Sequence, residues 1–161
     1  MKYDTKGGIF LESIDEKFKY AWRYMDERYS LFSSDELSKI QVISRNNAIK
    51  EWDNICDREI FQTSSYINKI INSNISVYIG NCKWGEDESE TEKELLKLFN
   101  EYRAEAVSLF YDRDTALYVS AELFCKKWSD FCYPSDSILI IFDAKIIIYY
   151  EDTIYGPVNR L

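Results

Sequence analysis

The sequence contains no histidine, and this absence excludes several large classes of function. Imidazole is the general base of many serine and cysteine hydrolases and a frequent ligand of zinc and iron. Glycine and proline are also scarce, at five and two of 161 residues. The paired glycines in Lys6-Gly7-Gly8 lack the GxGxxG or Walker spacing of a phosphate-binding loop. What is left for catalysis is carboxylate, lysine or tyrosine chemistry.

Long hydrophobic runs are missing as well. The longest apolar stretch, residues 138–150, is interrupted by Asp143 and Lys145 and is shorter than the roughly 18 residues that a membrane-spanning helix needs. The first residues show neither the apolar region nor the small-residue cleavage site of a signal peptide. We therefore expect a soluble, cytoplasmic protein.

Cysteine is present, but not in the pattern of a metal site or a disulfide framework. Cys56, Cys82, Cys125 and Cys132 are spread along the chain without a CxxC pair. We expect four reduced thiols, most of them packed in the core, and we predict no metal and no cofactor.

The length and the charge of the chain limit its organisation and its partners. A chain of 161 residues with 46% hydrophobic residues is long enough for one core, so we predict a single domain over residues 1–161. Its 28 acidic and 20 basic residues give a net charge of −8. Duplex nucleic acid and anionic membranes should repel this charge, whereas a basic partner should be attracted.

Hydrophobic periodicity predicts an α+β fold. Its N-terminal third is helical, and its C-terminal half is mainly an antiparallel sheet with helices packed on one face. Turns at residues 112–114 and 143–145 join two predicted hairpins. The predicted helices are residues 13–29, 34–37, 44–56, 64–72, 89–102 and 124–132, and the predicted strands are residues 75–79, 106–111, 116–120, 138–142 and 146–150.

Acidic residues are concentrated in one short part of the chain. Residues 86–105 hold eight carboxylates against three basic side chains, an excess of five negative charges. Such a run makes a local negative field that could attract a cationic partner. A solvated helix face with good capping would produce the same pattern.

Aromatic residues are more numerous than one core of this size usually needs. The chain has 13 tyrosines, nine phenylalanines and four tryptophans. Tyrosine is well suited to protein–protein interfaces because it combines an apolar ring with a polar end. We expect some of the tyrosines on or beside the predicted strands to face outward: Tyr111, Tyr118, Tyr149, Tyr150 and Tyr155.

Two aspartates are the best candidates for carboxylate chemistry. Asp112 and Asp114 flank Arg113 in a predicted hairpin turn, where they could act as an acid–base pair or hold magnesium. Aspartate is also common in turns for structural reasons alone. We therefore interpret both residues as part of a binding surface rather than of an active site.

In its overall character the chain resembles the immunity proteins of bacterial contact-dependent growth inhibition and related toxin systems. These proteins are short, cytoplasmic, acidic, rich in aromatic residues and without catalytic motifs. The segment FCKKWSDF at residues 124–131, ahead of an apolar hairpin, is also similar to a small set of uncharacterised bacterial proteins, which bears on the fold only. The resemblance to immunity proteins implies a partner toxin domain that is encoded by an adjacent gene and is often a nuclease acting on tRNA or DNA.

The sequence therefore predicts a non-enzymatic immunity protein that neutralises a basic toxin domain through an acidic, tyrosine-bearing surface. It should contact neither nucleic acid nor a membrane directly. Another acidic binding protein, such as an adaptor or an anti-defence protein that mimics nucleic-acid charge, stays open, as does a carboxylate-dependent enzyme. The predicted partner-binding residues are Glu86, Asp87, Glu88, Glu90, Glu92, Tyr111, Asp112, Asp114, Tyr149, Glu151, Asp152 and Tyr155.

Overall fold

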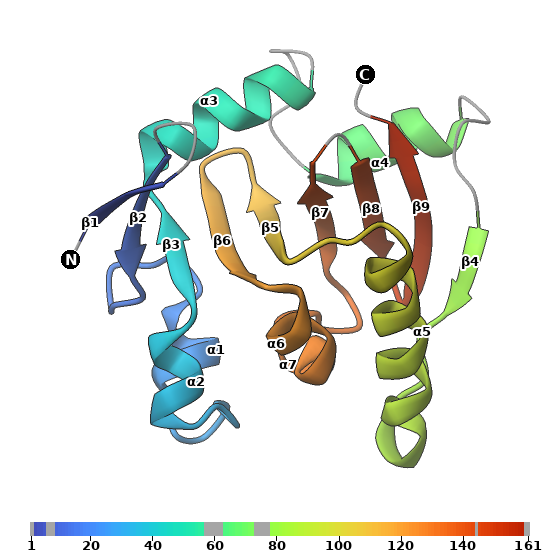
Figure 1. Cartoon of the computed structure of the whole chain (residues 1–161), viewed down its shortest axis with the longest axis horizontal. Coiled ribbons are helices and arrows are strands. Elements are labelled where there is room, and N and C mark those ends of the chain that lie inside the picture. Colours follow the sequence, from blue (N-terminus) through green and yellow to red (C-terminus); the bar gives the residue numbers. More distant parts are fainter. Residues whose placement is uncertain (1, 6–8, 57–62, 73–77, 144, 160–161) are drawn as a thin grey trace.

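The protein is built on one antiparallel sheet (Figure 1). The computed structural model describes residues 2–5, 9–56, 63–72, 78–143 and 145–159. Its nine strands follow the order β1-β2-β3-β6-β5-β7-β8-β9-β4. The strands are β1 (Lys2–Thr5), β2 (Ile9–Ser13), β3 (Gln41–Ile43), β4 (Tyr78–Asn81), β5 (Ala106–Asp112), β6 (Thr115–Ser120), β7 (Ser137–Phe142), β8 (Lys145–Tyr150) and β9 (Thr153–Asn159).

Helices are distributed along the whole chain, and the α+β class is confirmed. The longest is α5, which begins directly after a short 3-10 turn, η1 (Gly85–Asp87). The α-helices are α1 (Ala21–Met25), α2 (Ser34–Ser38), α3 (Arg45–Ile55), α4 (Thr63–Asn72), α5 (Glu88–Glu101), α6 (Ala121–Lys126) and α7 (Trp128–Phe131).

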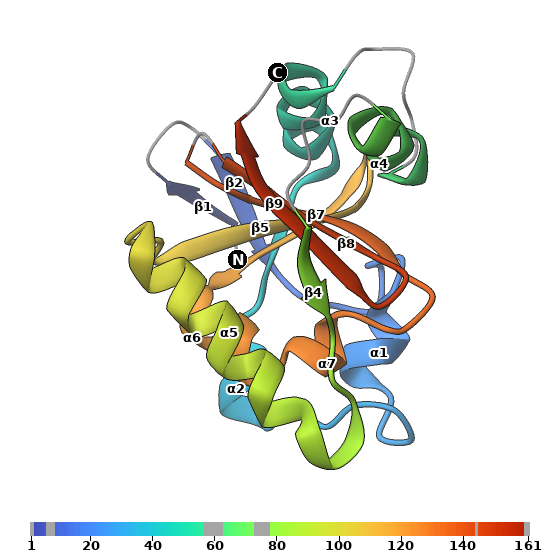
Figure 2. The same ribbon diagram turned by 90° about the vertical axis from the view of Figure 1, so that its right-hand side faces the viewer.

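Helices pack on both faces of the sheet rather than on the single face that the sequence predicted (Figure 2). In β7, Ile138 and Ile140 face the core beneath α5, α6 and α7. Leu139 and Ile141 of the same strand face the core beneath α3 and α4. Because successive side chains of a strand point to opposite faces, a continuously apolar strand needs cover on both sides.

The N-terminal third contains helices, as predicted, but it also contributes three strands to the sheet. The expected helix over residues 13–29 is reduced to the five residues of α1. Aspartates limit it on both sides: Asp15 accepts a hydrogen bond from the Lys17 backbone N–H, and Asp26 accepts one from the Arg28 backbone N–H. A side chain that bonds its own backbone two residues on favours a turn over a helix.

The C-terminal half follows the predicted hairpins closely. β5 pairs with β6 and β7 pairs with β8, each in antiparallel register. The predicted helix over residues 124–132 begins earlier, at Ala121, and is divided into α6 and α7 at Lys127. Of the predicted strand 75–79, residues 75–77 lie outside the described residues, and β4 covers the rest.

The four cysteines are free and buried. Burial, followed by the charge of Asp152, raises the pKa of Cys82 to about 12, so its thiol is protonated at neutral pH. None of the helices that the structure describes has both the length and the apolar character needed to cross a membrane.

Candidate partner-binding surface

The acidic run forms η1 and α5, which stand at one end of the molecule (Figure 1). The first turn of α5 carries Glu88 and Glu90, where carboxylates interact favourably with the positive end of the helix dipole. Leu95 and Phe99 on the opposite side of the helix are buried against the sheet. The sequence periodicity of α5 thus leaves most of its carboxylates in solvent.

These carboxylates differ from several others among the described residues, which are paired with basic side chains. Among the described residues, carboxylates in the N-terminal third, the β5–β6 turn and the α7 region form ion pairs, but none of the acidic run does. We define the acidic surface as the carboxylates of this run apart from Glu88: Glu86, Asp87, Glu90, Glu92, Glu94, Glu101 and Glu105.

Glu88 differs from its neighbours because it links α5 to α7. Its carboxylate accepts a hydrogen bond from Ser129 at 3.1 Å, and its backbone carbonyl accepts one from Trp128 Nε1 at 3.1 Å. The side chain is half-buried. Glu88 was predicted to bind a partner, but its contacts assign it a structural role.

The β8–β9 turn brings two further predicted residues near the start of α5. Asp152 accepts a hydrogen bond from Nε1 of Trp84, the residue before η1, at 2.8 Å. Glu151, its neighbour in the turn, is exposed. The structure therefore brings Glu151 and Asp152 into the same region as Glu86 and Asp87, although about 65 residues separate them in sequence.

Asp112 and Asp114 lie at the β5–β6 turn, which is away from α5, at the top of Figure 1. Asp112 accepts hydrogen bonds from Lys19 Nζ at 2.6 Å and from the Tyr20 hydroxyl at 3.1 Å. Asp114 accepts one from Arg45 Nε at 3.2 Å. Both carboxylates are thus neutralised by basic side chains and do not belong to the acidic surface, and their predicted role in partner binding stays a prediction.

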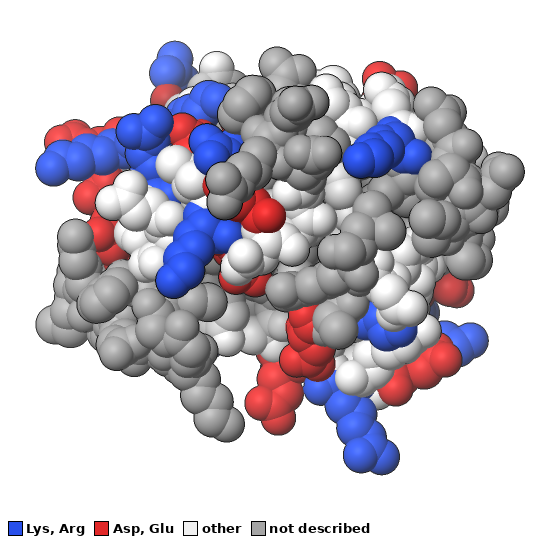
Figure 3. All heavy atoms as spheres, turned by 90° about the horizontal axis from the view of Figure 1, so that it is seen from above, with Lys and Arg blue, Asp and Glu red and all other residues white. Residues whose placement is uncertain are grey.

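This end of the molecule carries both signs of charge in close proximity. Figure 3 shows Lys and Arg side chains beside Asp and Glu side chains over it. Arg113 itself pairs with Asp53 of α3, with nitrogen–oxygen distances of 2.9 and 3.0 Å. The charges here join the hairpin to its neighbours and leave little net field.

Two of the predicted surface tyrosines are in the core. Tyr111 is 5% exposed; its hydroxyl donates to the Phe131 carbonyl at 2.8 Å and accepts from Tyr24. Tyr149 is 1% exposed and donates to the Tyr133 carbonyl at 2.9 Å. Tyr155 is half-buried against the core beneath α3 and α4. The prediction of Tyr111 and Tyr149 as binding residues is therefore wrong.

Comparison with known proteins assigns the chain to a family. The family model described as "Protein of unknown function (DUF2947)" matches residues 13–155. The chain belongs to the DUF2947 family. The matched region includes all of the acidic surface, the β5–β6 turn and the β8–β9 turn. No curated protein and no solved structure gave a significant match.

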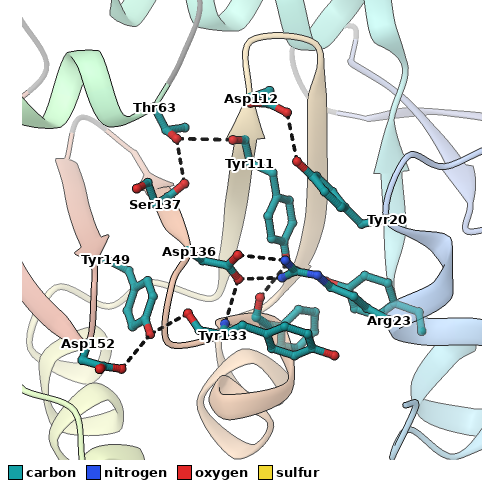
Figure 4. A network of polar contacts seen from close by, with 12 residues as sticks. Tyr20, Arg23, Thr63, Tyr111, Asp112, Tyr133, Asp136, Ser137, Tyr149 and Asp152 are labelled. Atoms are coloured by element: carbon teal, nitrogen blue, oxygen red, sulfur yellow. Dashed lines mark hydrogen bonds and ion pairs between the residues drawn. The ribbon is translucent and has the colours of Figure 1, made fainter. Parts of the chain in front are cut away.

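A largely buried ion pair lies in contact with several tyrosine rings of this DUF2947 protein (Figure 4). Arg23 of α1 donates two hydrogen bonds to Asp136, at 2.6 and 2.8 Å. The guanidinium also lies over the rings of Tyr133 and Tyr111, at 4.2 and 5.3 Å from their centroids. Burial lowers the pKa of Arg23, but the hydrogen bond to Asp136 and the charges of Asp136, Tyr111 and Tyr24 together outweigh this effect and raise the pKa of the guanidinium.

The exposed aromatic residues are different from those that the sequence indicated. Trp22, Met25, Tyr29 and Leu31 are 43%, 47%, 50% and 72% exposed, and they lie on α1 and the loop after it. The first three lie within the predicted helix over residues 13–29, which is much shorter in the structure. The aspartates on either side of α1 were the signal that could have revealed them.

The described residues contain no group of three or more cysteine, aspartate and glutamate side chains placed to hold a metal ion. Burial and neighbouring charges shift the pKa values of individual carboxyl groups. Asp130, for example, has its pKa raised by burial and by Glu88 and Glu36 nearby, against the opposing effect of Lys127.

Proposed function

We propose that this DUF2947 protein is an immunity protein that binds and neutralises a basic toxin domain, a nuclease, in the cytoplasm of the cell that produces both. It acts by complementary contact rather than by catalysis. The observation that carries this proposal is the acidic surface, whose carboxylates have no ion-pair partners among the described residues.

Unpaired carboxylates gathered on one helix suit a cationic partner. Nuclease clefts are basic because they hold phosphate, so carboxylates can occupy them in place of phosphate groups. Long-range attraction between opposite charges accelerates encounter, and close contact then slows dissociation. Glu86, Asp87 and Glu90 are exposed at the start of α5 and can make such contacts without rearrangement of the core.

Two other features support the proposal, one on binding rather than catalysis and one on the compartment. Asp112 and Asp114, the best candidates for an acid–base pair, are each held by a basic side chain. The four buried free cysteines fit a reducing compartment, which agrees with action in the cytoplasm.

Co-production with the toxin domain tests the proposal. The probe is the C-terminal domain encoded by the gene adjacent to that of this protein, produced in a sensitive bacterial host. We expect the unsubstituted protein to restore growth and the E86K/E90K variant to lose most of this protection, because the reversal places positive charge opposite a basic surface.

The control is E16K/E27K, which makes the same change in net charge at exposed glutamates outside the acidic surface. We expect it to protect as well as the unsubstituted protein. An adjacent domain that is not toxic, or protection that E86K/E90K retains in full, would contradict the proposal. Thermal unfolding of each variant establishes that the substitutions leave the fold intact.

A further inference from the structure

A groove of about 550 Å³ lies between the C-terminal part of α5 and the start of α6. Figure 2 shows the two helices side by side. The floor of the groove is apolar and is formed by Leu96 and Phe99 of α5, Ala104 after that helix, and Ala121 of α6. Leu96 and Ala104 are only half-buried, so part of this floor meets solvent. An apolar floor of this kind favours contact with an apolar side chain.

The edges of the groove are acidic on both sides. Glu92 stands on α5, Glu105 after the end of α5, and Glu122 on α6. Among the described residues that line the groove, Lys126 is the only cation, and its ammonium group lies 3.5 Å from Glu36. The groove therefore keeps a net negative charge after its own lysine is paired.

Glu92 is directed towards α6 rather than away from it. It is half-buried, and after burial its charge is the next cause that raises the pKa of Cys125, on α6, to about 12. Glu105 and Glu122 are exposed. Both walls of the groove can thus present a carboxylate to a molecule that lies between the helices.

We propose that this groove receives a basic amphipathic helix of the partner protein. Apolar side chains of that helix rest on Leu96 and Ala104, and lysine or arginine side chains on its flanks reach Glu92, Glu105 and Glu122. A helix fits this arrangement because residues at i, i+3 and i+4 form one apolar stripe with polar flanks on either side. This inference rests on the proposed function and identifies the part of the partner that is recognised.

The volume of the groove agrees with such an occupant. Pockets of about 300–1,000 Å³ hold small ligands, so 550 Å³ accommodates several side chains but not a whole helix. Lysine and arginine can lay their methylene stems along apolar surface while their charged ends meet the carboxylates. The helix axis would consequently lie above the groove, with one face turned into it.

Two synthetic peptides test the proposal on the full chain. Each has about 18 residues, enough for a helix to form, and the same content of leucine and lysine. One has leucine at helical spacing and the other has leucine and lysine in strict alternation. We expect the helical isomer to bind about tenfold more tightly at low salt, because only it presents an apolar stripe with basic flanks.

Substitutions locate the binding site. We expect E105K/E122K to weaken binding of the helical peptide about tenfold, and L96S to abolish the preference for the helical isomer over the alternating one. The matched control is E94K/E101K, which reverses two exposed glutamates of α5 that do not line the groove, and which should weaken binding less than threefold. Equal affinities for the two peptides, or equal losses in the two double variants, would overturn the proposal.

The toxin domain separates this inference from the proposed function. If E86K/E90K weakens toxin binding and E105K/E122K does not, the groove assignment is wrong and the immunity function stands. If the peptides discriminate as expected but the protein gives no protection against the toxin domain, the immunity function is wrong and the groove assignment stands. Circular dichroism and thermal unfolding identify any variant whose loss comes from misfolding.

Discussion

Arg23 joins two parts of the chain that are far apart in sequence. It lies in α1, and Asp136 lies just before β7, 113 residues later. The Arg23 side chain is only 7% exposed, and two parallel hydrogen bonds plus the Tyr133 ring replace part of the water that its guanidinium has lost, although Nε has no hydrogen-bond partner among the described residues. Asp136 also accepts a hydrogen bond from the Tyr133 backbone N–H at 2.7 Å, which fixes the turn before β7.

Removing Arg23 should therefore be costly. We expect R23A to lower the free energy of unfolding by about 3–5 kcal/mol, because Asp136 would be left partly buried without its partner. Urea denaturation measures the change. R28A is the control, since Arg28 is exposed and its pair with Asp26 lies in solvent, so we expect a much smaller loss than in R23A. A loss below about 1 kcal/mol in R23A would show that the pair is not stabilising the fold.

Single residues also mark the limit of prediction from the sequence. The sequence indicated that some tyrosines on the strands, with Tyr111 and Tyr149 among the candidates, would face outward, but it could not show which faces of the sheet were covered. Both tyrosines point towards the face covered by α5, α6 and α7, where long-range hydrogen bonds satisfy their hydroxyls. Partners such as the Phe131 and Tyr133 carbonyls depend on tertiary structure and have no local sequence signal.

At the scale of elements, short helices depend on their caps. α2 has five residues, too few to be stable by itself. Ser33 Oγ accepts a hydrogen bond from the Glu36 backbone N–H, and the Glu36 carboxylate accepts one from the Ser33 backbone N–H. The bond from Ser33 and the nearby charge of Lys127 lower the pKa of Glu36 against the effect of burial.

This lowered pKa predicts a pH-dependent effect of the E36Q substitution. A carboxyl group whose pKa falls on folding stabilises the protein above its unfolded pKa of about 4.3, and the contribution disappears as pH falls through the lower folded value. We expect E36Q to destabilise the protein by about 1 kcal/mol at neutral pH, and the difference from the unsubstituted protein to shrink below about pH 4. Thermal unfolding across this range measures it; a difference that is constant with pH would contradict the expectation.

Most elements of the C-terminal half could be predicted because their patterns are local. The apolar runs of β7 and β8 and the acidic start of α5 each carry a clear signal. β9 was missed because Gly156 and Pro157 interrupt it, and both residues usually weaken a strand. Gly156 has φ +107°, and a Cβ there would lie 2.8 Å from the Ile146 carbonyl oxygen, so the close approach of β8 requires glycine.

At the scale of the whole molecule, charge is divided between two ends. Basic and acidic side chains neutralise one another around the β5–β6 turn, whereas the carboxylates of η1 and α5 have no such partners among the described residues. The sequence correctly located this acidic run but could not show that Asp112 and Asp114 lie far from it (Figure 1). That separation follows from the strand order, because β7, β8 and β9 lie between β5 and β4, the strand that leads into η1 and α5.

The association rate with the toxin domain, measured against salt concentration, tests the proposed role of the acidic surface most directly. For the unsubstituted protein we expect this rate to fall about tenfold or more between about 50 and 300 mM NaCl. E86K/E90K should associate more slowly at low salt and show a much weaker salt dependence. Equal rates and equal salt dependence for the two proteins would contradict a function based on this surface.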